Sequence, residues 1–470
     1  MKNFLVTLTV LTLYLFCSSF AQSTDDTWNR LAGSAFIDNH SFDLLERLCD
    51  EAGGRMMGTS KNKKAMEIMK QELERLSIAA HYETFNVPGW QRGEDKVKMT
   101  YPAEKDFNAI ALGYADSVPE FEANAVFAGY GFSEEYNEKD VKGKIVLVSS
   151  ERPKGKEPLL RYEAIDIAAE KGAKAILFIN EHPGTLNLAG TGNFQGTPTL
   201  IPAFSLNYEE GMWLKRLLTN GKDVKLDLSV KSRCKEVETA NLVYSIPGKV
   251  KEKIVIGAHF DSWDISQGAI DNGIGTAILF DVARLIKTFA ESNYFSIDFV
   301  WFNGEEFGLW GSKMYAEMHR NDRIVAMVNM DMTGEPTGFN VMGFDQFIPF
   351  FNDLKFRLNG FDLSSGVVNY PYTNSDHIPF MFKGIPTFSL QAHLDEDMVK
   401  YYHSSGDTFD KVNKKYLSEA SAVVSIMVKE LANLKMLEKG KKTPEQMADL
   451  FRKFHLDERL KRQKEWIYGN

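Results

Sequence analysis

The sequence predicts an α/β protein with a mostly parallel sheet, covered by helices on both faces, and a second domain inserted into the chain. From residue 241 onward, short and almost continuously apolar runs alternate with amphipathic stretches. Such runs are typical of parallel strands buried between two layers of helices. Residues 97–236, which precede this pattern, differ from it in character, and a chain of 470 residues is too long for one ordinary small domain.

The chain begins with a segment typical of a secretory signal. Residues 4–16 are almost wholly apolar, and Ser19-Phe20-Ala21 places small residues at the two positions that a signal peptidase reads. The apolar run is shorter than the roughly 20 residues that a membrane-spanning helix needs. We therefore expect residues 1–21 to be removed and the mature protein to be exported, to a periplasm or an extracellular space, without a membrane anchor.

Two amphipathic helices are predicted between Ser41 and Ile78, with Gly53-Gly54 separating them. Residues 97–236 then hold short apolar strands and two helical stretches, but few groups able to carry out chemistry. We interpret this segment as an inserted domain that shapes access to a site elsewhere. The catalytic domain is then formed by residues 22–96 and 237–470.

Composition limits the partners of this protein. Its net charge is −9, and its sequence indicates no basic surface of the kind that nucleic-acid binding requires. Small molecules or peptides are therefore the expected partners.

Once the signal is removed, Cys49 and Cys234 are the remaining cysteines. They do not make a disulfide framework, and the sequence leaves open whether they pair with each other.

The first motif that could bind a metal ion or take part in catalysis follows a predicted strand over residues 253–257. His259 and Asp261 are two residues apart, so alternation along an extended chain places both side chains on one side. A metal-bound histidine needs such a carboxylate to fix its tautomer. Taken alone, this pair is better explained by a structural histidine than by a metal ligand.

A second motif, Gly268-Ala269-Ile270-Asp271-Asn272-Gly273, precedes a predicted helix. Its ordinary interpretation is a turn with a helix cap. The alternative is that Asp271 bridges two metal ions, with the glycines allowing the backbone to approach closely.

Acidic residues also end the next two predicted strands. Glu305 and Glu306 follow the strand SIDFVWF, and Asp331 follows IVAMVN. Adjacent acids at buried strand ends are costly unless a positive charge neutralises them, although solvated loop acids would explain them too. His403 lies in a polar loop further on. Together these side chains form an imidazole and carboxylate set suited to two zinc ions, since the reactive groups of such a sheet gather at strand carboxyl ends.

The runs HFDSWDISQGAIDNG, FNGEEFGLWGS, NMDMTG, YTNSDHIPF and YHSSGDTFD, in this order, resemble the motifs of the M28 zinc peptidase family. The inserted segment is similar to a protease-associated domain. The resemblance covers nearly the whole mature chain and implies a zinc peptidase fold, a peptide substrate and a homodimer. One departure is Asn272, where relatives can carry a second acid.

Carried over by matching position, the resemblance implies a division of roles. His259 and Asp331 would hold one zinc ion, Glu306 and His403 the other, and Asp271 would bridge the two. Further implied roles are a general base for Glu305, an orienting carboxylate for Asp261 and a hydrogen-bond donor to the reaction intermediate for Tyr372.

The resemblance implies an exopeptidase that uses metal-activated water on dipeptides or the terminal bonds of short peptides. An aminopeptidase acting on longer peptides is the alternative. A glutaminyl cyclase would be expected to hold one zinc through three ligands, and an inactive receptor-like homologue would have lost ligands or the base. A serine hydrolase is disfavoured because Ser375, Asp376 and His377 are consecutive and cannot converge as a triad.

Overall fold

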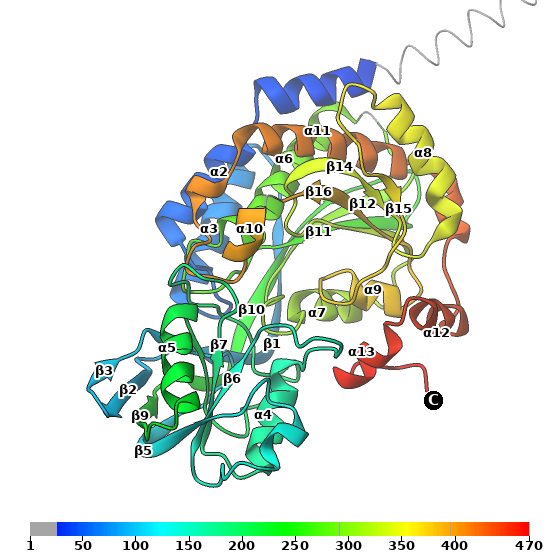
Figure 1. Ribbon diagram of the computed structural model, residues 1–470. Helices are drawn as coiled ribbons and strands as arrows, with labels where there is room; N and C mark the ends of the chain where they lie inside the picture. The colour runs from blue at the N-terminus through cyan, green and yellow to red at the C-terminus, as the bar shows by residue number, and fades with distance from the viewer. Residues whose placement is uncertain (1–25, 291, 395, 470) are drawn as a thin grey trace, which may run out of the picture.

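A mixed β-sheet with helices on both faces forms the larger part of the molecule (Figure 1). The computed structural model describes residues 26–290, 292–394 and 396–469, so the predicted signal at 1–21 lies outside the described residues. In order across the sheet, the strands are β1 (His81–Gln91), β10 (Arg233–Ile246), β12 (Ser296–Phe302), β11 (Lys253–His259), β13 (Ile324–Asn329), β16 (Thr387–His393), β14 (Glu335–Asn340) and β15 (Gly366–Val368).

The predicted α/β class is confirmed, and the parallel part of the sheet is its centre. Strands β12, β11, β13 and β16 run parallel to one another. On one side β1 and β10 are antiparallel to their neighbours, and on the other side β14 is antiparallel to β16. The sheet is therefore mixed, and its four central strands share one carboxyl edge.

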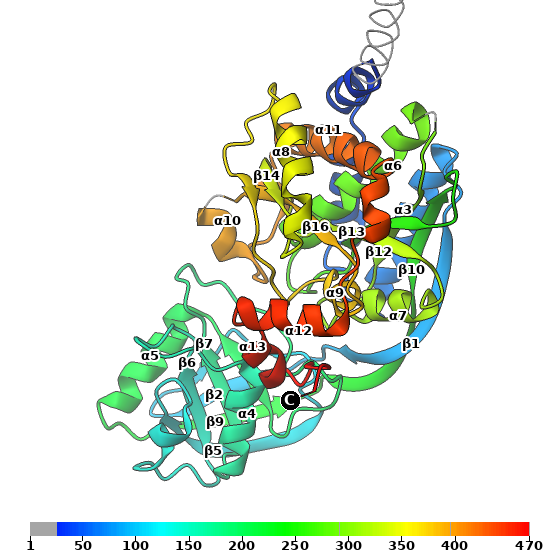
Figure 2. The same cartoon turned by 90° about the vertical axis from the view of Figure 1, so that its right-hand side faces the viewer.

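Helices cover both faces of this sheet, as predicted. α6 (Ile274–Phe289) packs against α2 (Ser41–Arg47) and α11 (Lys414–Leu431) on one face, whereas α7 (Trp310–Met318) and α9 (Ile378–Phe382) lie on the other (Figures 1 and 2). Every residue of α6 from 274 to 286 is buried, because the helix lies between the sheet and other helices, and the two charged residues of this stretch, Asp281 and Arg284, pair with each other at 2.8 Å.

A second sheet belongs to the inserted segment. Across it run β3 (Lys105–Asp106), β2 (Lys96–Tyr101), β9 (Lys225–Val230), β5 (Val118–Phe127), β6 (Ile145–Ser149), β7 (Ala175–Ile179), β8 (Ala203–Leu206) and β4 (Ala109–Ala111). Helices α4 (Arg161–Glu170) and α5 (Tyr208–Thr219) flank it. The long antiparallel pair β1 and β10 connects the two sheets, and the domain boundaries at 97 and 236 stay a prediction.

The C-terminal helices α12 (Pro444–Lys453) and α13 (Asp457–Arg462) return toward the inserted segment (Figure 2). Arg462 forms an ion pair with Glu163 of α4, and Lys313 of α7 lies 2.7 Å from Glu465. Other helices are the π-helices η1 (Leu48–Ala52) and η3 (Ala269–Gly273), α3 (Ser60–Arg75), α8 (Ile348–Arg357), α10 (Glu396–Tyr401) and the 3₁₀ turns η2 (Ser133–Tyr136), η4 (Asp345–Phe347), η5 (Phe409–Lys411) and η6 (Lys435–Lys439), and residues 26–37 are also helical.

The fold answers one question that the sequence left open, the state of the two cysteines. Cys49 is buried and Cys234 is partly buried, and both are free thiols. Across the described ranges, no helix has the length and apolarity required to cross a bilayer.

Candidate metal centre

The carboxyl edge of the central parallel strands gathers four of the predicted site residues. His259 is the last residue of β11 and lies in register with Phe302 at the end of β12. Glu305 and Glu306 are the third and fourth residues after β12, and Asp331 is the second residue after β13. Because these strands are parallel neighbours, their ends meet at one edge, as the sequence predicts.

Two loops bring the remaining acid and histidine to this edge. Asp271 lies in the turn η3 (Ala269–Gly273), directly before α6. Gly275 lets α6 approach the end of β13, since an added Cβ would lie 2.4 Å from the carbonyl oxygen of Met330. His403 follows α10 and has a left-handed backbone, with φ of 52°.

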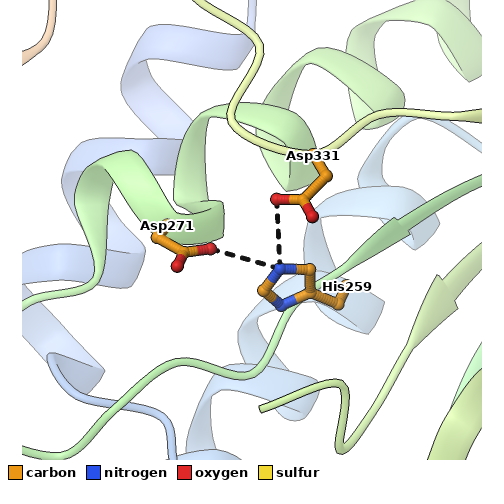
Figure 3. Close-up of side chains that lie close together, drawn as sticks. All are labelled: His259, Asp271 and Asp331. Carbon is orange, nitrogen blue, oxygen red and sulfur yellow. Dashed lines mark ion pairs between the residues drawn. The ribbon is translucent and has the colours of Figure 1, made fainter. Parts of the chain in front are cut away.

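The five predicted ligands form two groups that share Asp271. In the first, Nε2 of His259 lies 3.2 Å from Oδ1 of Asp271 and 3.4 Å from Oδ1 of Asp331 (Figure 3). In the second, Nε2 of His403 lies 3.1 Å from Oδ2 of Asp271 and 2.8 Å from Oε2 of Glu306. The ligand atoms of each group lie within 4.8 Å of one another. The two oxygens of Asp271 thus face different histidines.

This set of side chains fits a pair of cations. Nε2 of His259 and Nε2 of His403 each face two carboxylate oxygens. An imidazole N–H donates to only one acceptor, so hydrogen bonding by the histidines does not account for both oxygens. Neither oxygen of Glu306 accepts a hydrogen bond of good geometry among the described residues, despite the 2.8 Å contact with His403. Burial raises the pKa of Glu306 to about 7, so the chain alone neutralises this carboxylate poorly. Imidazole and carboxylate ligands in this arrangement suit zinc.

The buried carboxylate of Asp261 contacts the two segments that carry the first histidine and the glutamates. It accepts hydrogen bonds from the backbone amides of Glu305, at 3.2 Å, and Glu306, at 3.4 Å. Its Oδ1 lies 3.6 Å from Nδ1 of His259, while its own backbone carbonyl oxygen lies 3.1 Å from the same nitrogen. The carboxylate of Asp261 thus holds the glutamate turn, while its backbone carbonyl lies within hydrogen-bond distance of the imidazole; its role in orienting His259 stays a prediction.

Glu305 and two tyrosines complete the surroundings. Burial raises the pKa of Glu305 well above its ordinary value, and its side chain lines a cavity together with Glu306 and His403. Tyr402 lines the same cavity and stacks on His403, with ring centroids 3.8 Å apart. The ring of Tyr372 instead packs against His377 at 4.3 Å, so its predicted contact with a reaction intermediate stays a prediction.

Asp407 and Arg55 support the centre, although sequence reasoning assigned them no role. The carboxylate of Asp407 accepts hydrogen bonds from the amides of Ile270, at 2.6 Å, and Asp271, at 3.1 Å. Asp407 lies in YHSSGDTFD, one of the runs that resemble the M28 motifs, so the sequence did point to this residue as part of the site. The fully buried guanidinium of Arg55 donates to the carbonyls of Phe260 and Gly268, which flank two ligand-bearing segments.

The inserted segment also touches the loop of the second histidine. The amide of Ala189 donates to the carbonyl of His403 at 2.7 Å, and Leu188 forms an antiparallel bridge with Ser404. This segment was expected only to shape access to the site. The contacts show that it also holds the backbone of a candidate ligand.

Comparisons with known proteins agree with this arrangement. Residues 241–428 match the model of peptidase family M28, and residues 110–214 match the PA domain. Carboxypeptidase Q from Mus musculus is 26% identical over 415 residues, which cover 84% of this chain and 86% of that protein. Aminopeptidase YwaD from Bacillus subtilis (strain 168) is 27% identical over 415 residues, covering 84% and 85%.

Solved structures give the same result at the level of the fold. The M28 peptidase precursor from Shewanella amazonensis SB2B aligns with a TM-score of 0.76 at 25% identity, covering 88% of this chain and 98% of that one. A zinc aminopeptidase from Bacillus subtilis aligns with a TM-score of 0.69 at 24% identity, covering 84% and 95%. The chain therefore contains a peptidase domain of family M28 with a PA domain inserted into it.

Proposed function

We propose that this protein is an exported zinc exopeptidase that hydrolyses dipeptides or the terminal bonds of short peptides with two zinc ions. The observation that carries the proposal is the position of Asp271, whose two oxygens face His259 and His403 separately. A carboxylate placed in this way is suited to bridge two cations. Support also comes from relatives named for carboxypeptidase and aminopeptidase activities.

In this proposal His259 and Asp331 hold one zinc ion, and Glu306 and His403 hold the other. Bound zinc would polarise the scissile carbonyl and lower the pKa of the attacking water. Glu305 belongs to neither ligand group yet lines the same cavity, so it is placed to accept a proton from that water and return it to the leaving amine. No residue of the chain becomes covalently attached to the substrate.

The cavity beside the centre is large enough for a short peptide. Its volume is about 340 Å³, within the range of roughly 300–1,000 Å³ common for small-molecule sites. An aminopeptidase acting on longer peptides is the second candidate, supported by the relative named aminopeptidase YwaD. Retention of all five candidate ligands and of Glu305 disfavours a single-zinc glutaminyl cyclase and an inactive receptor-like protein.

Export follows in this proposal from the predicted signal at 1–21, and N-terminal sequencing of secreted protein should begin after Ala21. The homodimer implied by the family resemblance also stays a proposal, and light scattering on the mature protein would measure it.

The direct test of the proposed function combines metal content with dipeptide hydrolysis. Purified protein should contain about two zinc equivalents, lose activity when a chelator removes them and recover it when zinc is returned. Hydrolysis at an undiminished rate by metal-free protein would contradict the proposal.

A further inference from the structure

The cavity beside the candidate metal centre has a wall that neither the catalytic strands nor the inserted segment provides. Glu305 and His403 line the cavity from the catalytic side, and α4 with its neighbouring loops lines it from the inserted segment. Gln463 and Glu465 form a third wall near the C-terminal end of the chain. We call residues 457–469, which comprise α13 and the residues after it, the C-terminal strap (Figure 2).

The C-terminal strap belongs to neither of the two matched domains. The match to family M28 ends at residue 428, and the match to the PA domain covers residues 110–214. The strap is nevertheless packed into the fold, since Leu460 is fully buried and Gln463 is 3% exposed. It is therefore a fixed part of the cavity wall that lies beyond both domains.

Arg462 fastens the C-terminal strap to the inserted segment. Its Nε donates to Oε1 of Glu163 at 2.8 Å, its Nη2 donates to Oε2 of the same carboxylate, and Nη2 also donates to the carbonyl of Pro158 at 3.0 Å. The two side chains of this ion pair are only 32% and 20% exposed. Gln195 adds a second connection, because it donates to the carbonyl of Gln463 at 3.0 Å. A two-pronged pair shielded in this way holds its geometry better than an ordinary surface pair.

Other residues fasten the C-terminal strap to the catalytic domain. Nζ of Lys313 in α7 lies 2.7 Å from Oε1 of Glu465. The hydroxyl of Tyr468 donates to the carbonyl of Phe382, the last residue of α9, at 3.0 Å. The ring of Tyr468 also packs against Phe451 of α12, with centroids 5.9 Å apart. The strap therefore crosses from one domain to the other and is held at both ends of the crossing.

This crossing restricts the space available to a long substrate. A cavity between two domains could otherwise continue along the boundary between them, and an extended peptide lengthens by roughly 3.3–3.6 Å for each residue. A peptide that runs out of the cavity toward the strap meets α13. Moving α13 aside would break the contacts of Arg462 and Glu465 with both domains. A dipeptide that ends within the cavity requires no such movement.

We infer that the C-terminal strap limits the substrates of this protein to short peptides, because a peptide that extends beyond the cavity on this side has to displace it. The inference rests on the proposed function and specifies its substrate class: dipeptides and peptides short enough to end within the cavity. Arg462 does not itself line the cavity and acts through the strap, so it is a positioning residue.

The test uses three peptides that share one Ala–Leu bond, and it follows cleavage of that bond. They are alanylleucine, Ala-Leu-Ala-Ala, which extends on the carboxyl side, and Ala-Ala-Ala-Leu, which extends on the amino side. Wild type should prefer the dipeptide over at least one tetrapeptide by roughly 10–200-fold in kcat/KM, the range typical of discrimination by pocket shape. Arg462→Gln should reduce this preference by roughly fivefold or more, because the strap then opens at a lower cost. The change should come from faster cleavage of the tetrapeptide, with kcat/KM for the dipeptide nearly unchanged.

The adjacent charge in α13 provides the matched control. Lys461 pairs with Asp457 and Glu458 of the same helix, so Lys461→Gln removes a positive charge without detaching the strap and should keep the wild-type preference. Lys313→Gln, which releases the strap on the catalytic side, should act in the same direction as Arg462→Gln. Zinc content and circular dichroism verify that each variant is folded. An unchanged preference in both Arg462→Gln and Lys313→Gln, or an equal change in Lys461→Gln, would overturn the role of the strap.

A binding measurement separates this inference from the proposed function. Calorimetry of the three peptides with Glu305→Gln protein, and with the Glu305→Gln/Arg462→Gln double variant, measures affinity without turnover. The difference in affinity between dipeptide and tetrapeptide should be smaller in the double variant, and equal differences would contradict the inference. A smaller difference in protein that shows no zinc-dependent hydrolysis would refute the peptidase mechanism and leave the strap standing. Absence of peptide binding in both proteins would overturn both.

Discussion

The carboxylate of Asp261 accepts a hydrogen bond from the backbone amide of Glu305, with 3.2 Å between Oδ1 and the nitrogen. The same carboxylate reaches the amide of Glu306 and lies near the ring of His259. One fully buried acid therefore couples the end of β11 to the turn that follows β12. The proposed base and two proposed ligands depend on its position.

We predict that Asp261→Asn lowers kcat/KM by roughly 10–100-fold, the range found when groups that orient metal ligands are changed. The substituted amide can accept from one backbone N–H but presents its own donors to the other. Kinetics and zinc content should be measured on the same samples. Asp264→Asn is the matched control, because that carboxylate pairs with Arg92 at 2.7 Å and should leave activity nearly unchanged. Equal effects of the two variants would contradict the claim that Asp261 supports the metal centre more than Asp264 does.

A second prediction concerns stability. Arg55 is fully buried and donates to the carbonyls of Phe260, Gln267 and Gly268 at 2.7–2.8 Å. Arg55→Met leaves these acceptors without their donor, so the free energy of unfolding should fall by about 3 kcal/mol or more. Urea unfolding checks this. Arg75→Gln, which breaks one exposed pair with Glu72, should cost no more than about 1 kcal/mol. Comparable losses in both variants would show that Arg55 is not an important support.

A third prediction concerns pH and lies away from the metal centre. The ring nitrogens of His319 lie 3.0 Å from Glu83 and 2.7 Å from Asp322. Hydrogen bonding to Glu83, followed by that to Asp322, raises the pKa of His319 against the opposing effect of burial. A raised folded-state pKa adds stability that is fully present below the unfolded-state pKa of about 6.5 and is lost as pH rises through the folded-state value.

The free energy of unfolding lost in His319→Gln should accordingly be largest below about pH 6 and should shrink as pH rises above the folded-state pKa of His319. Denaturant titrations of wild type and variant across this range measure the difference. His182→Gln, on an exposed loop of the inserted segment, is the control and should change stability little at either end. A loss that grows with pH would mean that His319 is held neutral.

The sequence predicted the convergence of the candidate ligands because a general rule applies to their positions. His259, Glu306 and Asp331 each follow an apolar strand, and parallel strands place their carboxyl ends at one edge. The mixed character of the sheet was not predictable in the same way. The run NLVYSI of β10 has the same apolar pattern whichever direction the strand runs, and its antiparallel pairing with β1 and β12 depends on the whole fold.

Side chains that form hydrogen bonds with backbone groups far away in the sequence could not be identified from the sequence. Asp407 binds amides 136 and 137 positions away, and Arg55 binds carbonyls more than 200 positions away. No local spacing encodes such partners.

The measurement that tests the central claim most directly compares Glu305→Gln with Glu306→Gln, determining zinc content and dipeptide turnover on the same samples. These adjacent residues have different roles in the proposal. Glu305→Gln removes a proton acceptor, so zinc should stay while turnover falls by roughly 10²–10⁴-fold or more. Glu306→Gln removes an anionic ligand, so one zinc ion should bind more weakly and excess zinc should partly restore activity. Loss of zinc from Glu305→Gln with retention in Glu306→Gln would require the two roles to be exchanged, and unchanged turnover in both would place the active site elsewhere.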